Sequence, residues 1–93
     1  MQKMNKNGFS RCAEMYIERL RKEGRYSTAH VYKNALLSFT TFCGTFNVSF
    51  RQVTRGRLRC YGQYLYECGL KPNTVSTYMR MLRSIYNLSL IHI

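Results

Sequence analysis

The chain has 93 residues, 45% of them hydrophobic and 14% aromatic, which is enough for one small packed domain and too little for two. Fifteen lysines and arginines stand against four glutamates and no aspartate, so the net charge is +11 at pH 7. So few carboxylates argue against paired-carboxylate hydrolysis, calcium binding and two-metal catalysis. No stretch approaches the ~18 apolar residues of a membrane span, and no apolar run follows the basic first eight residues, as it would in a signal peptide.

Apolar residues recur at helical spacing in two segments of the first half. The segment Phe9–Lys22 predicts a first helix, with Ser10 as its N-cap and Gly24 stopping it. A second helix is expected to open at Tyr26 and to run up to Gly44, with Ser27 as its N-cap.

Two more helices are predicted in the second half. Asn47–Val53 alternates apolar and polar residues but has no partner strand, so we expect a tethered loop. The segment Thr54–Gly69 predicts a third helix, with Thr54 as its N-cap and Gly69 just after its C-terminus. Gly62 inside this helix indicates the close approach of a neighbouring helix. Pro72 ends one element, and Asn73 is expected to cap the fourth helix. The sequence therefore predicts an all-α, four-helix domain.

The cysteines lie singly along the chain, at Cys12, Cys43, Cys60 and Cys68. They form no Cys-x-x-Cys pair, and neither histidine has a cysteine at ligand spacing, so no metal site is predicted. Two disulfides are the alternative, but the chain lacks the secretory signal that usually accompanies them. We expect free thiols that pack as small apolar residues.

Positive charge is concentrated after the first helix. From Tyr26 onward there are eight lysines and arginines and one acid, Glu67, which favours a polyanionic partner. The second and fourth helices both begin in this region with short polar side chains, beside free backbone N–H groups and the positive end of the helix dipole. If the two beginnings converge on one surface, they suit phosphate oxygens and a nucleic-acid groove. The residues so predicted are Ser27, Thr28, Asn73, Thr74, Thr77 and, one turn further, Arg80.

The alternative is that Ser27 and Asn73 only cap helices and that the basic residues form a solvated face. The expected third helix adds Arg55 and Arg59 on one side and Arg57 on another, either as part of a surface that follows a nucleic-acid backbone or as solvated charge.

A tyrosine nucleophile is chemically conceivable. However, no tyrosine has an Arg/His cluster around it in the sequence, so no catalytic residue is predicted. Five of them lie on apolar stripes, where we expect core packing: Tyr16, Tyr32, Tyr61, Tyr78 and Tyr86.

Three ordered motifs carry a family resemblance. They are Y-S-T-x3-Y-x3-L-x2-F-x2-F over Tyr26–Phe42, F-x2-V-T-x3-L-x2-Y-x2-Y-L over Phe50–Leu65, and G-L-K-P-N-T-x3-Y-x2-M-L-R-x-I-Y-N over Gly69–Asn87. Together they resemble the N-terminal core-binding, or SAM-like, domain of phage-integrase-type tyrosine recombinases. Within that family they are most similar to integrases of Bacteroides-type mobile elements.

The resemblance implies a four-helix orthogonal bundle that clamps one side of a recombination-site duplex, while a separate catalytic domain closes on the other side for DNA integration and recombination. In such domains the second and fourth helices face the DNA, which adds His30, Asn34 and Lys71 to the contacts named above. It also implies a bacterial, cytoplasmic, nucleoid-associated protein that is monomeric alone and whose parent assembles as an oligomer on DNA.

The family's catalytic Arg/His cluster and tyrosine nucleophile have no counterpart in these 93 residues, so we expect no enzymatic activity and no cofactor. Residues 1–8 are expected to form a flexible N-terminal segment, and residues 9–87 the core-binding domain. Residues 88–93 do not resemble the family's usual continuation, and we expect them to be a truncation tail.

Other functions fit parts of the pattern. A helical protein–protein module could present the same basic surface to an acidic partner, and fold analogy does not exclude it. RNA binding is disfavoured because no aromatic residue falls in an obvious exposed stacking platform. A membrane-surface helix is disfavoured because the apolar faces are committed to one shared core.

Overall fold

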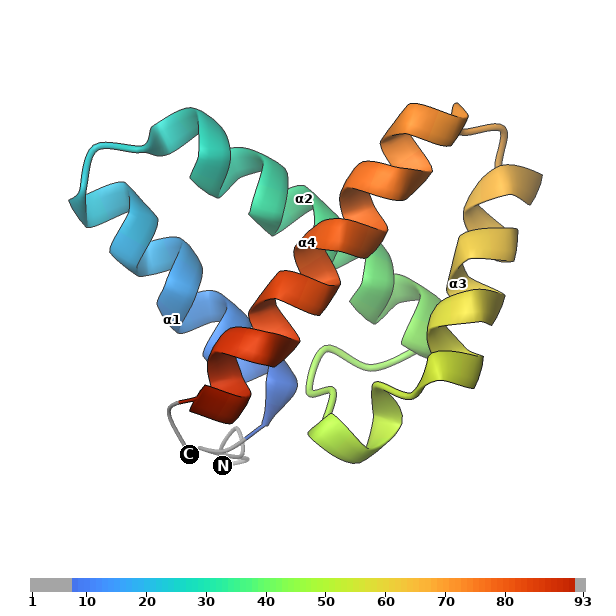
Figure 1. The fold of residues 1–93 in the computed structure, drawn as a ribbon, viewed down its shortest axis with the longest axis horizontal. Helices are drawn as coiled ribbons and strands as arrows, with labels where there is room; N and C mark the ends of the chain where they lie inside the picture. Colours follow the sequence, from blue (N-terminus) through green and yellow to red (C-terminus); the bar gives the residue numbers. More distant parts are fainter. Residues whose placement is uncertain (1–7, 92–93) are drawn as a thin grey trace.

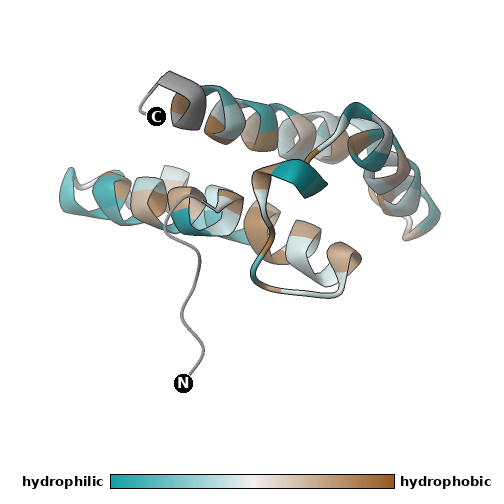
Figure 2. Ribbon diagram, turned by 90° about the horizontal axis from the view of Figure 1, so that it is seen from below, coloured by the Kyte–Doolittle hydropathy of each residue, from teal (hydrophilic) through white to brown (hydrophobic). Residues whose placement is uncertain are grey.

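The structure is a computed structural model that describes residues 8–91, with side chains described for residues 8–88. It contains four α-helices and one 3-10 turn, and no strand within the described residues: α1 (Phe9–Lys22), α2 (Tyr26–Cys43), η1 (Phe50–Gln52), α3 (Arg55–Glu67) and α4 (Pro72–Ile91). The predicted all-α class and the four helices are confirmed. In Figure 1, α4 crosses in front of α2, with α1 on one side and α3 on the other. In Figure 2, turned by 90°, α4 lies in the layer above α1.

One aromatic cluster joins the first three helices. Phe9, Phe39 and Tyr61 are fully buried, and their ring centroids lie 6.0 Å apart for Phe9–Phe39 and 5.1 Å apart for Phe39–Tyr61. The Tyr61 hydroxyl group donates a hydrogen bond of 2.7 Å to Ser38 Oγ, so the buried phenol is satisfied. Burial raises the pKa of Tyr61 to about 12. The predicted core packing of the five tyrosines is confirmed, since the other four pack against this core.

Ser10 does not cap α1, contrary to the prediction. The residue before the helix is Gly8, which makes no side-chain cap, and Ser10 lies inside the first turn, fully buried. Its Oγ accepts a hydrogen bond of 2.9 Å from the Val48 N–H, and its own N–H donates one of 3.1 Å to the Val48 carbonyl. This reciprocal pair ties the connection between α2 and α3 to α1, so the tethered loop is confirmed and contains η1.

Two other predicted caps are also wrong. Arg25 occupies the N-cap position of α2, with no side-chain cap, and Ser27 is an exposed residue within the first turn. The fourth helix starts at Pro72, because proline lacks the N–H that a first helical residue leaves unpaired and has a helical φ. Asn73 is therefore inside that helix. The predicted cap at Thr54 is confirmed, since its Oγ1 accepts a hydrogen bond of 3.1 Å from the Arg57 N–H.

The helices end close to the predicted glycines. Gly44 and Gly69 have φ values of 78° and 89°, the left-handed conformation that closes a helix without steric cost for glycine. At its far end α4 continues to Ile91, past the predicted domain end at residue 87. Most of the expected N-terminal segment, residues 1–7, and the last two residues of the expected tail, 92–93, lie outside the described residues.

All four cysteine thiols are free. Cys12 and Cys43 are half-buried, but Cys60 and Cys68 are exposed, so the prediction of packed thiols is wrong for the two on and just after α3. In the described part of the chain, no helix combines the length and apolar character needed to cross a membrane.

We predict that Ser10→Ala lowers the free energy of unfolding by about 1–3 kcal/mol, because the buried Val48 N–H would lose its partner. Ser27→Ala, at the exposed site that capping rules singled out, should change it by less than about 0.5 kcal/mol. Urea denaturation of both variants measures the difference. An equal loss of unfolding free energy in the two variants would show that the hydrogen bonds between Ser10 and Val48 do not stabilise the fold.

The buried Gly62 lies beside the Met79 side chain of α4, but the predicted close approach of a neighbouring helix is not found there. A Cβ placed there would lie 3.9 Å from Met79 Sδ, which is ordinary van der Waals contact, so the site has room for alanine. Gly62→Ala should therefore raise the free energy of unfolding by up to about 1 kcal/mol. The matched variant Gly44→Ala should lower it by about 1 kcal/mol, because its left-handed backbone disfavours a side chain. Thermal unfolding gives both signs, and a destabilising Gly62→Ala would show that the helices are closer than described.

Candidate nucleic-acid interface

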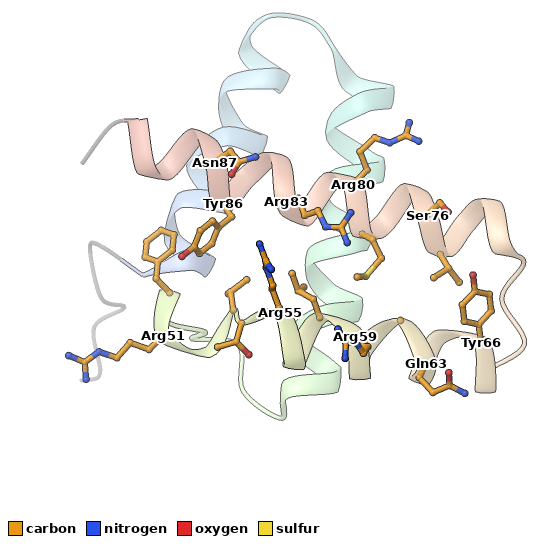
Figure 3. A pocket seen from close by; sticks show the side chains of 17 residues that line it. Arg51, Arg55, Arg59, Gln63, Tyr66, Ser76, Arg80, Arg83, Tyr86 and Asn87 are labelled. Atoms are coloured by element: carbon orange, nitrogen blue, oxygen red, sulfur yellow. The ribbon is translucent and has the colours of Figure 1, made fainter.

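An open groove runs between two walls of the fold. One wall is formed by η1 and α3 and the other by α4 (Figure 3). Its volume is about 1450 Å³, whereas pockets for small molecules typically measure about 300–1,000 Å³. An open groove of this size suits a macromolecular ligand better than a small molecule, which typically binds in an enclosed pocket.

Arginine is the dominant charged residue of the groove. The five lining arginines, all exposed, come from both walls: Arg51, Arg55 and Arg59 from η1 and α3, and Arg80 and Arg83 from α4. Figure 3 shows Arg55 and Arg83 pointing into the groove from its two walls, while Arg51 and Arg80 point away from it. We refer to these five residues as the arginine groove.

The acids of the protein do not neutralise this charge. No glutamate lines the groove, and the ion pairs of the described residues lie on or just after α1, Arg19–Glu23 at 3.4 Å and Arg21–Glu18 at 3.7 Å. Among the described residues, the arginine groove thus carries five positive charges without an ion-pair partner. The same part of the chain holds no cluster of three metal-ligating side chains.

Helical spacing explains which arginines of α3 take part. Arg55 and Arg59 are one turn apart and both line the groove, whereas Arg57 does not, as predicted. Arg57 is half-buried, and its charge acts on the Cys43 thiol at the end of α2. Burial raises the pKa of that thiol, and the guanidinium partly offsets the rise.

A polar stripe runs along the exposed face of α4. Its members are spaced three and four residues apart, so they fall on one side of the helix. They are Asn73, Ser76, Arg80, Arg83 and Asn87, and all are exposed. The α4 stripe contains no acid, and its last four residues also form the upper edge of the arginine groove in Figure 3.

The two helix beginnings on which the predicted site depended do not converge. Because α2 and α4 cross, their first turns diverge, and Figure 1 places them at opposite ends of the upper edge. Ser27, His30 and Asn34 are exposed and Thr28 is half-buried, all on the first turns of α2 and none in the groove. The predicted convergence of the two beginnings is therefore not found, and their contact with one ligand remains a prediction.

The predicted residues at the start of α4 divide between the stripe and its flank. Arg80 lines the groove, Asn73 belongs to the stripe, and Lys71 is exposed in the turn before the helix. Thr74 and Thr77 are half-buried, and the Thr77 hydroxyl donates a hydrogen bond of 2.8 Å to the Asn73 carbonyl within the helix. Contact of these nine residues with DNA remains a prediction.

Arg51, Arg83 and Asn87 are groove residues that the sequence reasoning did not select. The three-and-four spacing of polar residues from Asn73 to Asn87 was present in the sequence and would have indicated Arg83 and Asn87. Nothing in the sequence indicated Arg51, because it lies in a 3-10 turn whose position depends on the tether between Ser10 and Val48.

A family model described as the phage integrase SAM-like domain matches residues 8–91. The chain belongs to this family. No curated protein and no solved structure matches it. The matched region is the whole described fold, so all four helices belong to the SAM-like domain, and no catalytic domain is matched.

The unpaired charge of this SAM-like domain predicts a salt effect on stability. Raising sodium chloride from about 0.01 to about 1 M shortens the screening length from about 30 to about 3 Å. Screening of the repulsion between the arginines should raise the free energy of unfolding by about 1 kcal/mol. In a domain of this size, that corresponds to a rise of about 4–8 °C in the melting temperature.

A double variant, Arg55→Gln with Arg83→Gln, should show a smaller rise with salt than the wild type in thermal unfolding. The matched double variant Arg19→Gln with Arg21→Gln loses the same charge, but both of its arginines have glutamate partners. The melting temperature of this control variant should rise with salt at least as much as that of the wild type. If the control showed the smaller rise, the repulsion would lie outside the arginine groove.

Proposed function

We propose that this SAM-like domain binds duplex DNA and holds a recombination site for a catalytic domain located elsewhere in an integrase. The observation that carries the proposal is the arginine groove beside the α4 stripe, five exposed and unpaired positive charges from two walls with no acid among them. Phosphate contacts supply most of the affinity of proteins for DNA, and an unneutralised cationic surface is suited to them.

The geometry of α4 suits the major groove of DNA. The helix has 20 residues and is therefore about 30 Å long, and a major groove about 12 Å wide admits one helix. Arginine pairs with guanine and asparagine with adenine through two hydrogen bonds each. Arg80, Arg83 and Asn87 on the stripe can read bases in this way, while Arg51, Arg55 and Arg59 contact the flanking phosphates.

The residues at the beginnings of α2 and α4 add phosphate contacts in this proposal. The first turn of α2 has neither a side-chain cap nor an acidic residue, so its backbone N–H groups can bind a phosphate together with Ser27 and Thr28. His30 and Asn34 extend this patch. At the other end, Lys71, Asn73, Thr74 and Thr77 extend the α4 stripe. The two patches meet the duplex separately, since the helix beginnings diverge.

The family resemblance extends the proposal to the whole protein. The parent is an integrase of a Bacteroides-type mobile element that acts on the bacterial nucleoid. Its SAM-like domain is monomeric alone, and the parent assembles as an oligomer on DNA. Cleavage and strand exchange belong to the catalytic domain, and the 93 residues bind DNA without enzymatic activity or a cofactor.

The test is binding of a fluorescein-labelled duplex to the 93-residue chain, followed by fluorescence anisotropy at several salt concentrations. If the domain neutralises about five phosphates, log K should fall with log salt at a slope of about −4 to −5. Arg55→Ala should weaken binding and shrink the slope by about one, because Arg55 contacts a phosphate in this proposal.

Arg21→Ala is the matched control, with the same loss of charge on α1, away from the groove. It should leave the slope nearly unchanged. Binding that ignores salt, or no binding at low salt, would reject the proposal. Capture of an acidic protein that excess duplex cannot displace would favour the protein–protein alternative instead.

A further inference from the structure

The arginine groove has an aromatic group at each end. Tyr66 lies at one end and is 48% exposed. Phe50 and Tyr86 lie at the other end, with ring centroids 5.6 Å apart in an edge-to-face arrangement. Figure 3 shows Arg55, Arg59 and Arg83 between the two ends. Tyr66 therefore provides an exposed aromatic side chain at one end of the row of arginines, which is not expected from the sequence.

The floor of the groove limits what can enter it. The walls contact each other where Met79 of α4 covers Gly62 of α3, with the Met79 sulfur 3.9 Å from the position of a Gly62 Cβ. Val53 and Val75 are buried residues of the floor. A duplex can rest across the rims of such a groove but cannot lie within it. A single strand has one row of phosphates and unpaired bases, and it can enter.

The spacing of the groups fits a short strand. From Arg55 to Tyr66 the α3 wall advances eleven residues, or about 16 Å. At about 3.4 Å per stacked nucleotide this is room for about five nucleotides. Aromatic rings and guanidinium planes bind any base by stacking, and arginines bind the phosphates, which together are the contacts used in sequence-tolerant single-strand binding.

We propose that the arginine groove is a binding site for single-stranded DNA, with a base stacked on Tyr66 and the phosphates on Arg55, Arg59 and Arg83. This activity goes beyond the proposed binding of duplex DNA. Single-strand binding does not depend on duplex binding. The stacking residue Tyr66 lies off the α4 stripe and carries no charge, so it is not among the residues proposed to contact the duplex.

The test compares two labelled strands of about ten units in fluorescence anisotropy with the 93-residue chain. One is oligothymidylate, and the other is an abasic strand with the same phosphates and no bases. Oligothymidylate should bind more tightly, and Tyr66→Ala should weaken its binding about tenfold. The same substitution should leave the abasic strand and a duplex unchanged.

Tyr26→Ala is the matched control, because Tyr26 is 68% exposed on α2 and does not line the groove. It should leave the affinities for oligothymidylate and for the abasic strand unchanged. Amide NMR gives an independent readout. Oligothymidylate should shift the Gly62 resonance in the groove and leave that of Gly24, in the turn after α1, in place.

Three results would overturn the site: equal affinity for oligothymidylate and the abasic strand, equal effects of the two tyrosine substitutions, or no shift at Gly62. A polyglutamate peptide that displaces the strand and binds more tightly would reassign the groove to an acidic protein segment. A failure of duplex binding alone would reject the proposed function and leave the single-strand site standing.

Discussion

The position of α3 depends on one buried side chain. Tyr61 is fully buried, with its ring packed against Phe39 and its hydroxyl group bonded to Ser38, both on α2. Because the phenol has both an apolar neighbour for its ring and a partner for its hydroxyl, it anchors α3 on α2, together with the contacts of Phe42 with Tyr61 and Tyr64. The rotation of α3 decides that Arg55 and Arg59 face α4 while Arg57 faces Cys43. The arginine groove is thus a consequence of how the core holds this helix.

The fold also separates the charges of the chain. Three of the four glutamates lie on or just after α1, and two of them pair with arginines one turn away. Those pairs are exposed, so they contribute little to stability, but they leave the surface of α1 nearly neutral. The bases of η1, α3 and α4 keep their full charge on the other side of the core. The net charge of +11 is therefore distributed unevenly over the surface. In the proposed function, this uneven field selects the face that meets the DNA.

Periodicity predicted the helices well because each has one strongly apolar stripe, and the turn glycines at 44 and 69 have the expected left-handed backbone. The helix starts were harder, since a hydroxyl group near a helix start can cap it or bond elsewhere. Thr54 caps α3, whereas Ser10 bonds Val48, 38 residues away. The crossing of α2 and α4, which separates the beginnings of the two helices, is a tertiary feature without a local signal. The family match covers the fold and says nothing of these side chains.

The α4 stripe and the arginine groove share Arg80 and Arg83. In the two proposals a duplex and a single strand would both contact Arg55, Arg59 and Arg83, so the two ligands must compete for these arginines. Tyr66 separates the two modes, because stacking requires an unpaired base and a duplex has none to offer. Exposure of this tyrosine could not be read from the sequence, where it is adjacent to the buried Leu65 in a run of aromatic residues. In these two proposals, the discrimination between one strand and two therefore rests on an uncharged side chain, and the affinity for both rests on the arginines.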